Sequence, residues 1–474
     1  MSFFILNPYR IYRIFLRQQI RGRYTPVIGD LLNVARAKAR GEMLQFMDKM
    51  FDEYGQYYHS SLGPVARFLT CDPSIMQYVL KKNVKSYHKS LIMKYILGTL
   101  LGMENLLMAE DEVHQLHRRI IGPVFQHQNL ISMLSLMTDK TELIINKWKR
   151  LMDETTKSYV DLDFHVEMAN LTLDIVCGCL FGTDLINNIE IHRFIYNSVT
   201  NAYRETEKRL FNMIGIIPIL KDLPLPSKLR MDKGKQEVKK VILKIIKDRK
   251  DGHSSAACKG ADLLDLLLSA QSESGQKLTD EQIYEEALTF VMAGHETTSN
   301  LMTWTFYNLT QHPIAYETCR KELDKVLNRG LPNPQNLSQL TYTEAILKES
   351  LRIHQPVPLI SRTAIEDNDV VAHDGKTIRI PKGVEILLNF YSLHHSDRYW
   401  PNPNEFNPDR FLDDKKMNII PHTLLPFSSG SRSCVGQNFA MLEAKVMLSR
   451  ILQEFDLELL PGQKIVPDIL VTMR

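Results

Sequence analysis

The sequence lacks the features that mark several easily recognised classes of protein. Its six cysteines show no paired spacing apart from Cys177-Gly-Cys179, so neither a disulfide framework nor a zinc set is visible, and a reducing compartment suits the pattern. A net charge of +3 gives no case for a nucleic-acid partner. Residues 40–360 contain no internal repeat and no low-complexity linker. With 44% apolar residues, the chain has an ordinary globular composition and can build a sizeable core.

The N-terminus also lacks the roughly twenty apolar residues of a transmembrane helix. Its residues are instead basic and amphipathic, with no acidic residue before Asp30. This pattern is typical of a helix on an anionic membrane surface, and a terminal helix packed on the body of the protein is the alternative. We therefore distinguish residues 1–40 from a single domain over residues 41–474. Arginines and apolar residues alternate at Arg10, Ile11, Arg13, Ile14, Phe15, Leu16, Arg17, Ile20, Arg21 and Arg23.

The rest of the chain predicts a mainly α fold with a small β portion. Residues 40–360 are expected to be almost continuous helix, with one brief strand near Val65 to Cys71. After Arg362, β-branched residues surround an Asp374-Gly375 turn, which predicts small hairpins at about 363–395. Breaks between helices are expected at 63–64, 72–74, 218–226, 251–260 and 331–334.

The most informative stretch is residues 427–437, Phe-Ser-Ser-Gly-Ser-Arg-Ser-Cys-Val-Gly-Gln. Apolar residues recur at helical spacing from Phe439 to Ile451, so Cys434 is expected close to the N-terminus of a buried helix. Unpaired N–H groups and the helix dipole favour a thiolate there, and a thiolate is the form that ligates iron. A buried free cysteine is the alternative.

The neighbours of Cys434 suit a haem. Gly430 can supply a turn with positive φ, and Gly436 has no side chain that would hold the backbone away from a flat macrocycle. Arg432 carries a forked cation suited to a carboxylate such as a haem propionate. Together with Phe427, these residues predict a haem-thiolate ligand loop.

A second motif, residues 293–298 with the sequence Ala-Gly-His-Glu-Thr-Thr, lies inside a helix predicted from Asp280 to His312. Gly294 weakens the helix, and the Thr297 hydroxyl can bond back to the carbonyl four residues earlier, which opens a space for water. Thr297 and Glu296 would then deliver protons for the cleavage of dioxygen.

One face of this helix should border the substrate. Phe290, Ala293, Thr297 and Leu301 share that face, although core packing is an equal alternative for Phe290 and Leu301.

The two motifs resemble the cysteine-ligand signature Phe-x-x-Gly-x-Arg-x-Cys-x-Gly and the oxygen-activation motif (Ala/Gly)-Gly-x-(Asp/Glu)-Thr-(Thr/Ser) of the cytochrome P450 family. All five fixed positions of the signature are present. The resemblance spans essentially the whole chain and implies the cytochrome P450 fold. It also implies haem b as cofactor, with Cys434 as iron ligand and with Ala293 and Gly294 against the haem.

The resemblance implies further haem and substrate contacts. His114 and Arg118 match the family's Trp-x-x-x-Arg, which binds a propionate, with histidine in place of tryptophan. An imidazole can still donate an N–H, and a solvated basic helix face is the alternative for His114. Arg362 matches an arginine that reaches a propionate, and Val357 and Leu359 would line the substrate cavity.

A structural network is also implied. Glu349 and Arg352 share a helix face and can pair, and they resemble the family's Glu-x-x-Arg. Arg410 matches a later arginine that joins this pair. The three residues would hold the cysteine loop in place.

The resemblance implies a monooxygenase that inserts one oxygen atom of dioxygen into a lipophilic fatty acid, sterol or foreign compound. Electrons would come from NADPH through NADPH-cytochrome P450 reductase, with Arg432, Lys415, Lys416 and Lys445 as docking contacts. In fatty-acid hydroxylases of the family a glutamate that ester-links to haem often stands at the position of Ala293. Alanine there weakens an assignment to that subgroup.

Microsomal relatives imply a place at the endoplasmic reticulum membrane, on its cytosolic face. The sequence shows no anchor helix and stops at Arg474, so we expect an anchor-less form or a truncated gene model. Two other functions stay open. Thr297 argues against a haem-thiolate isomerase or dehydratase, and Glu296, Thr297 and Cys434 together argue against a non-catalytic haem or lipid-binding protein.

Overall fold

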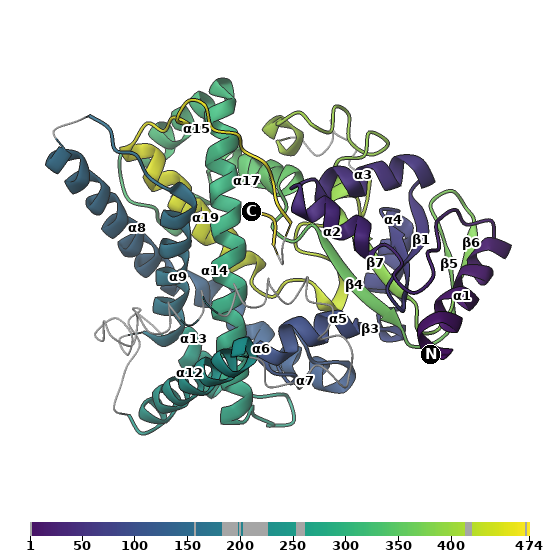
Figure 1. Cartoon of the computed structure of the whole chain (residues 1–474). Helices are drawn as coiled ribbons and strands as arrows, with labels where there is room; N and C mark the ends of the chain where they lie inside the picture. Colours follow the sequence, from purple (N-terminus) through teal and green to yellow (C-terminus); the bar gives the residue numbers. More distant parts are fainter. Residues whose placement is uncertain are drawn as a thin grey trace.

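The computed structural model describes residues 2–155, 158–182, 226–252, 261–412, 420–469 and 472–474, with the single residues 198 and 201. Figure 1 shows a long central helix, α14 (Asp280–Gln311), with helices on one side and the strands and N-terminal helices on the other. The mainly α fold with a small β portion is therefore confirmed. Lys415, Lys416 and nearly all of the predicted break at 218–226 lie outside the described residues.

Helices make up most of the described chain. In chain order they are α1 (Ser2–Arg17), α2 (Leu31–Ala39), α3 (Met43–Tyr54), α4 (Pro73–Gln77), α5 (Leu91–Met93), α6 (Thr99–Leu101), α7 (Asp111–Ile121), α8 (His127–Thr155), α9 (Phe164–Phe181), α12 (Pro226–Lys250), α13 (Leu263–Ser269), α14, α15 (Pro313–Leu327), α16 (Pro334–Leu337), α17 (Thr341–Ile353), α18 (Phe390–His394) and α19 (Gln437–Glu454).

Helix α14 begins at a capping box and packs against the apolar helix α9. Thr279 Oγ1 accepts from Gln282 N at 3.2 Å, and Gln282 Oε1 accepts from Thr279 N at 3.0 Å. A Cβ added to Gly294 would lie 3.3 Å from Val176 Cγ2, so glycine permits the close approach of the two helices. In the described part of the chain, α9 alone is long and apolar enough to cross a membrane, and its burial against α14 and α8 accounts for that composition.

The larger sheet has five strands in the order β1 (Tyr57–Leu62), β2 (Val65–Thr70), β7 (Glu385–Asn389), β4 (Leu359–Ala364) and β3 (Tyr87–Lys89). Strands β2 and β7 are parallel, and the other neighbours are antiparallel. A separate hairpin, β5 (Asn368–Val371) and β6 (Thr377–Ile380), turns at Gly375, whose φ is +85°.

The strand near residue 65 and the Asp374-Gly375 hairpin are confirmed. The expectation of almost continuous helix over residues 40–360 was wrong at β1 and β3. Strand β1 forms a hairpin with the neighbouring β2, whereas β3 depends on the distant strand β4 for its pairing. Residues 384–388 do not form a hairpin either. Residues 385–389 form β7, the middle strand of the larger sheet.

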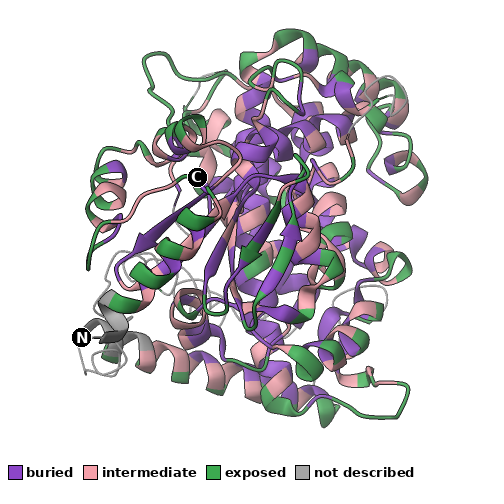
Figure 2. Ribbon diagram, turned by 90° about the vertical axis from the view of Figure 1, so that its right-hand side faces the viewer, coloured by how far each residue is buried: buried purple, intermediate pink, exposed green. Residues whose placement is uncertain are grey.

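The N-terminal helix packs on the protein. Ile11, Phe15 and Ile20 are at most 2% exposed, and the ring of Phe15 stacks on that of Phe68 with centroids 5.6 Å apart. Figure 2 shows buried residues running through the sheet and the helices around it. This apolar face is not available to a bilayer, so the alternative of a terminal helix packed on the body is the one observed.

Glu349 lies at the centre of a buried ion network. Arg352 donates two hydrogen bonds of 2.8 Å to its carboxylate, and Arg410 Nε donates a third of 3.2 Å. The side chains of Glu349 and Arg352 have no exposed surface. Arg352 also donates to the backbone oxygens of His394, Pro403 and Glu405, so the predicted contacts join α17 to residues 394–410.

We predict that Glu349→Gln lowers the free energy of unfolding by about 3–5 kcal/mol, because it leaves two buried guanidinium groups without a compensating charge. Urea unfolding followed by circular dichroism measures this loss. Lys348→Ala, which removes an exposed ion pair with Glu344, is the control and should change the value by less than about 1 kcal/mol. Equal effects of the two substitutions would contradict a stabilising role for the network.

Candidate active site

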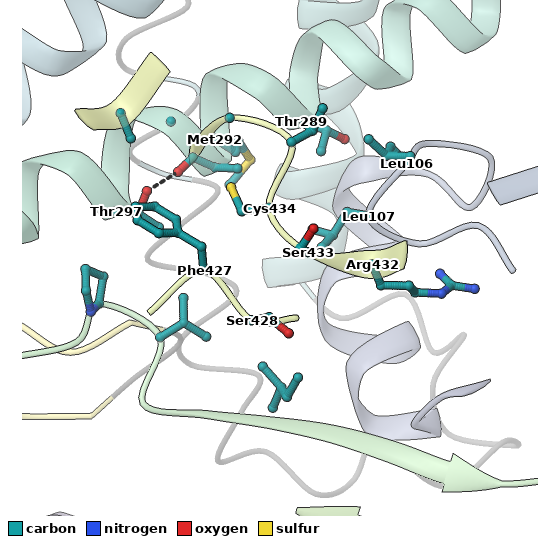
Figure 3. Close-up of a pocket in the computed structure, with 18 of the residues that line it drawn as sticks. Leu106, Leu107, Thr289, Met292, Thr297, Phe427, Ser428, Arg432, Ser433 and Cys434 are labelled. Carbon is teal, nitrogen blue, oxygen red and sulfur yellow. Dashed lines mark hydrogen bonds between the residues drawn. The ribbon is translucent and has the colours of Figure 1, made fainter. Parts of the chain in front are cut away.

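A cavity of about 400 Å³ lies between α14, α7, strand β4 and the cysteine loop. Figure 3 shows Cys434 near its centre, with Thr297 and Phe427 on one side and Leu106, Leu107 and Thr289 on the other. The wall is mostly apolar, apart from a basic region beside the cysteine loop.

The cysteine loop approaches the rest of the protein closely. Gly430 has a φ of +77°, as expected, and a Cβ there would lie 2.0 Å from Leu80 O, so only glycine fits. Cys434 N donates to Phe427 O at 2.9 Å, which closes the loop just before α19. A Cβ on Gly436 would lie 3.9 Å from Cys434 Sγ, in ordinary van der Waals contact with the sulfur, whereas glycine leaves that space free.

The thiol of Cys434 lines the cavity, where the residue has exposed surface. Burial raises its pKa, and the Gly436 N–H and the Arg118 guanidinium oppose that rise without overcoming it. The thiolate expected at this helix N-terminus therefore stays a prediction, which depends on a cation at the sulfur. A coordinated metal cation deprotonates such a thiol.

Four cations meet at the basic region, and we call Lys89, Arg118, Arg362 and Arg432 the cation cluster. Lys89 of β3 and Arg362 of β4 stand directly opposite each other in the antiparallel register. Burial lowers the pKa of Arg362 to about 10, and it lowers the pKa of Lys89 too, where Arg362 and Arg432 add repulsion. Like charges opposite each other destabilise a sheet. The cluster therefore needs anions.

Fewer anions than cations surround the cluster in the described part of the chain. Glu110 pairs with Arg432, while Arg118 donates to Ser433 O at 2.8 Å and Arg362 to Ser361 O at 2.8 Å. Two propionates would bring two further negative charges to this cluster, beside that of Glu110. The residues present therefore fit a haem whose iron is held by Cys434.

His114 also lines this region and is buried. Burial, with Arg432, Lys89, Arg118 and His117 nearby, lowers its pKa to about 3. The imidazole is therefore neutral and can donate one N–H, as its predicted role requires. Lys89 was missed by the sequence analysis, since only the pairing of β3 with β4 brings it to the site.

Thr297 makes the predicted back-bond, since its Oγ1 donates to Ala293 O at 2.7 Å (Figure 3). Helix α14 nevertheless continues through Gly294 without interruption, so the expected local failure of the helix was wrong. Glycine at position 294 instead allows α14 to pack closely on Val176 of α9.

Glu296 lies behind Thr297 and does not line the cavity. It accepts from Arg474 Nε and from Thr472 Oγ1, each at 2.9 Å. Burial alone would raise its pKa, but Arg474 and these hydrogen bonds hold the pKa below its ordinary value. Glu296 is therefore an anion in an ion pair with Arg474, and its part in the delivery of protons stays a prediction.

A second carboxyl near this part of α14 was missed. Glu443 of α19 is 1% exposed, and burial raises its pKa well above the ordinary value, with only the Thr298 hydroxyl opposing. The protonated form is therefore favoured. The sequence did hold a signal, because Glu443 falls on the buried face of the helix predicted from Phe439 to Ile451.

The apolar lining agrees with the sequence analysis. Phe290, Ala293, Leu301, Val357 and Leu359 all border the cavity, and the Phe290 ring packs edge-on to Phe125 at 5.2 Å. Lining residues without a readable sequence signal are Met93, Leu97, Leu101, Leu106, Leu107, Gln355 and Thr472.

Two of the basic residues expected at a docking surface have other partners. The Arg432 side chain is 8% exposed and donates to Ala109 O at 2.6 Å, facing the cavity. The Lys445 side chain is 13% exposed and donates to Glu344 Oε2 at 2.7 Å. Docking of a reductase at Arg432 and Lys445 therefore stays a prediction, although both side chains already have partners within the chain.

Comparisons with known proteins agree with this geometry. The family model of cytochrome P450 matches residues 21–471. Cytochrome P450 4F1 of Rattus norvegicus is 32% identical over 96% of this chain and 87% of its own length. Leukotriene-B4 omega-hydroxylase 3 of Mus musculus is 31% identical over 89% of this chain and 81% of its own length.

Among solved structures, the crystal structure of the cytochrome P450DA heme domain superposes with a TM-score of 0.80. It is 25% identical and covers 94% of this chain and 92% of its own. The chain therefore belongs to the cytochrome P450 family and is a haem monooxygenase of lipophilic substrates.

Proposed function

We propose that this monooxygenase holds haem b through Cys434 and oxidises the apolar end of a long-chain lipid acid. The observation that carries the proposal is the placing of Cys434 between an apolar cavity and an unbalanced cation cluster. When bound, the haem supplies the iron that activates dioxygen. Electrons would come from NADPH through NADPH-cytochrome P450 reductase.

The cation cluster and His114 would hold the two propionates. Arg118 and Arg432 already donate to backbone oxygens near the cysteine loop, so their remaining N–H groups are oriented by fixed contacts. Gly436 leaves room beside the sulfur. Ala293 provides no carboxylate for an ester link, so the haem would be held without a covalent bond to α14.

The charge balance favours one orientation of the substrate. The propionates would occupy the cation cluster, and no other lysine or arginine lines the described wall. A substrate carboxylate would therefore stay away from Cys434, with the apolar end of the chain nearest to it. In support, one relative is by its name an omega-hydroxylase of leukotriene B4, which is itself a lipid acid.

Thr297 would control protons at the cavity wall. Its hydroxyl donates to Ala293 O and can rotate toward the cavity, so Thr297 Oγ1 would hold a proton at the wall that Cys434 also lines. Glu296, held as an anion, would orient Arg474 and Thr472 in support of this wall.

Contact with the cytosolic face of the endoplasmic reticulum membrane remains part of the proposal. It would involve exposed residues and not the buried face of α1. Exposed apolar side chains occur on α1, on the turn after it and on α2. Arginines interleave with those on α1, which suits an anionic lipid surface. The exposed apolar residues are Leu6, Leu16, Val27, Ile28 and Leu32.

We predict that Cys434→Ser abolishes the long-wavelength Soret band in the difference spectrum of the reduced protein with carbon monoxide, because a hydroxyl does not replace the thiolate. Cys319→Ser is the control, since Cys319 is buried beside the Thr343 hydroxyl and away from the cavity. It should keep the band. A wild type without the band, or a Cys434→Ser variant that retains it, would show that Cys434 is not the ligand.

We predict that Thr297→Val uncouples the reaction, so that NADPH is still consumed while hydroxylated product per NADPH falls by about tenfold or more. The matched control is Thr305→Val. Thr305 makes the same back-bond, to Leu301 O at 2.7 Å, but does not line the cavity. If both variants remain equally coupled, Thr297 has no part in proton delivery.

We predict that wild type with the reductase and NADPH hydroxylates dodecanoic acid mainly at its terminal carbon, because the apolar end should lie nearest to Cys434. Mass spectrometry of the products locates the hydroxyl group. Attack near the carboxylate, or no product from a protein with a normal carbon monoxide spectrum, would contradict the proposed substrate class and orientation.

A further inference from the structure

Three segments that border the cavity meet at one buried carboxylate. Glu286 Oε1 accepts from Leu106 N at 2.7 Å and lies 2.7 Å from His117 Nδ1, which donates to it. The side chains of Glu286 and His117 have no exposed surface. We call this set of three residues the Glu286 junction. It joins α14, α7 and the loop of residues 102–110.

Each segment of the junction turns neighbouring residues into the cavity. On the loop, Leu106 and Leu107 line it. On α14, Thr289 lines it one turn after Glu286, and on α7 Arg118 lines it directly after His117. Figure 3 shows Leu106, Leu107 and Thr289 on the same side of Cys434. A displacement at the junction would therefore move the substrate wall.

The adjacent residue of α14 makes a second attachment to the same loop. Glu285 Oε2 accepts from Glu104 N at 2.9 Å, and its carboxylate occupies the space where a Cβ of Gly102 would stand. The carboxylates of the consecutive residues Glu285 and Glu286 thus accept from two N–H groups of the loop, those of Glu104 and Leu106. At the other end of the loop, Glu110 pairs with Arg432 of the cation cluster.

The Glu286 junction joins three segments at a cost in free energy, because it buries polar atoms. Within the described chain, neither Glu286 Oε2 nor His117 Nε2 has a hydrogen-bond partner, although both atoms are buried. Burial raises the pKa of Glu286, and the His117 hydrogen bond opposes the rise. Well-packed apolar residues often join buried segments at no greater cost. What they cannot do is fix the backbone of Leu106 through its N–H.

We propose that Glu286 and His117 are positioning residues that fix Leu106 and Leu107, and through them set how a long apolar chain lies against the haem. The inference rests on the proposed function in one respect, namely that the cavity holds haem. It adds that the reach of the cavity is determined by a hydrogen-bonded group outside it, since neither Glu286 nor His117 lines the wall.

The test compares binding of 1-methylimidazole and 1-dodecylimidazole to the purified haem protein, followed through the Soret band. Both ligands bind the iron, but only the long one reaches the wall at Leu106 and Leu107. We expect Glu286→Leu to change the ratio of the two Kd values by about threefold or more, with the Kd of 1-methylimidazole unchanged. His117→Leu should change the ratio in the same direction. His117→Asn, which keeps an N–H donor near the position of Nδ1, should restore it.

Glu322→Leu is the matched control. Glu322 also accepts two backbone N–H groups, from Tyr342 at 2.7 Å and Thr343 at 2.8 Å, but it joins α15 to α17 and does not line or border the cavity. It should leave the ratio unchanged. If Glu286→Leu does not fold, His117→Leu compared with His117→Asn carries the test.

An unchanged ratio in the Glu286 and His117 variants would overturn the inference, and so would an equal change in Glu322→Leu. These outcomes are distinct from failure of the proposed function. Imidazole binding needs neither turnover nor the natural substrate, so a changed ratio in a protein that leaves dodecanoic acid unoxidised would support the junction and reject the substrate class. A wild type that binds no haem would overturn both.

Discussion

The Glu349–Arg352 pair is the interaction on which the placing of the cysteine loop depends. Arg352 donates to His394 O, and His394 Nε2 accepts from Leu425 N at 2.9 Å. Leu425 O in turn accepts from Ser428 N, at the start of the cysteine loop. A continuous path of buried hydrogen bonds thus runs from α17 to the loop. Because Glu349, Arg352, His394 and Leu425 are buried, the loss of one leaves its neighbours unpaired.

The cation cluster places a second constraint on the site. Lys89 and Arg362 face each other across β3 and β4, so the protein alone contains repulsion that a dianionic cofactor would relieve. Binding of the haem would therefore stabilise the fold as well as complete the site. The same balance leaves the rest of the cavity without a free cation in the described wall, which suits substrates that present an apolar end.

The sequence predicted the parts of the site that lie within a few residues of each other. The cysteine loop, the Thr297 back-bond and the Glu349–Arg352 pair all depend on local spacing, and all are present. Lys89 depends on strand pairing with Arg362, far along the chain, and had no local signal. The charge state of Glu296 could not be predicted from neighbouring residues either, because its contact with Arg474 forms only in the folded chain.

Alternating basic and apolar residues proved ambiguous for a physical reason. A helix that packs on a sheet and a helix that lies on a membrane need the same apolar face, so the pattern of α1 could not distinguish them. The contact of Phe15 with Phe68 shows that this face of α1 packs on the sheet.

The loop of residues 102–110 shows why the shape of the cavity is harder to predict than its chemistry. Its cavity-facing side chains are leucines, which could pack in many ways, and its position is fixed by carboxylates that belong to other elements. Substitutions at Glu286 and at the leucines it positions can therefore alter selectivity separately. A substitution of Glu286 acts on the position of the loop backbone, whereas a substitution of the leucines acts on the volume of the wall. Only the second kind of residue is visible when lining residues are compared between relatives.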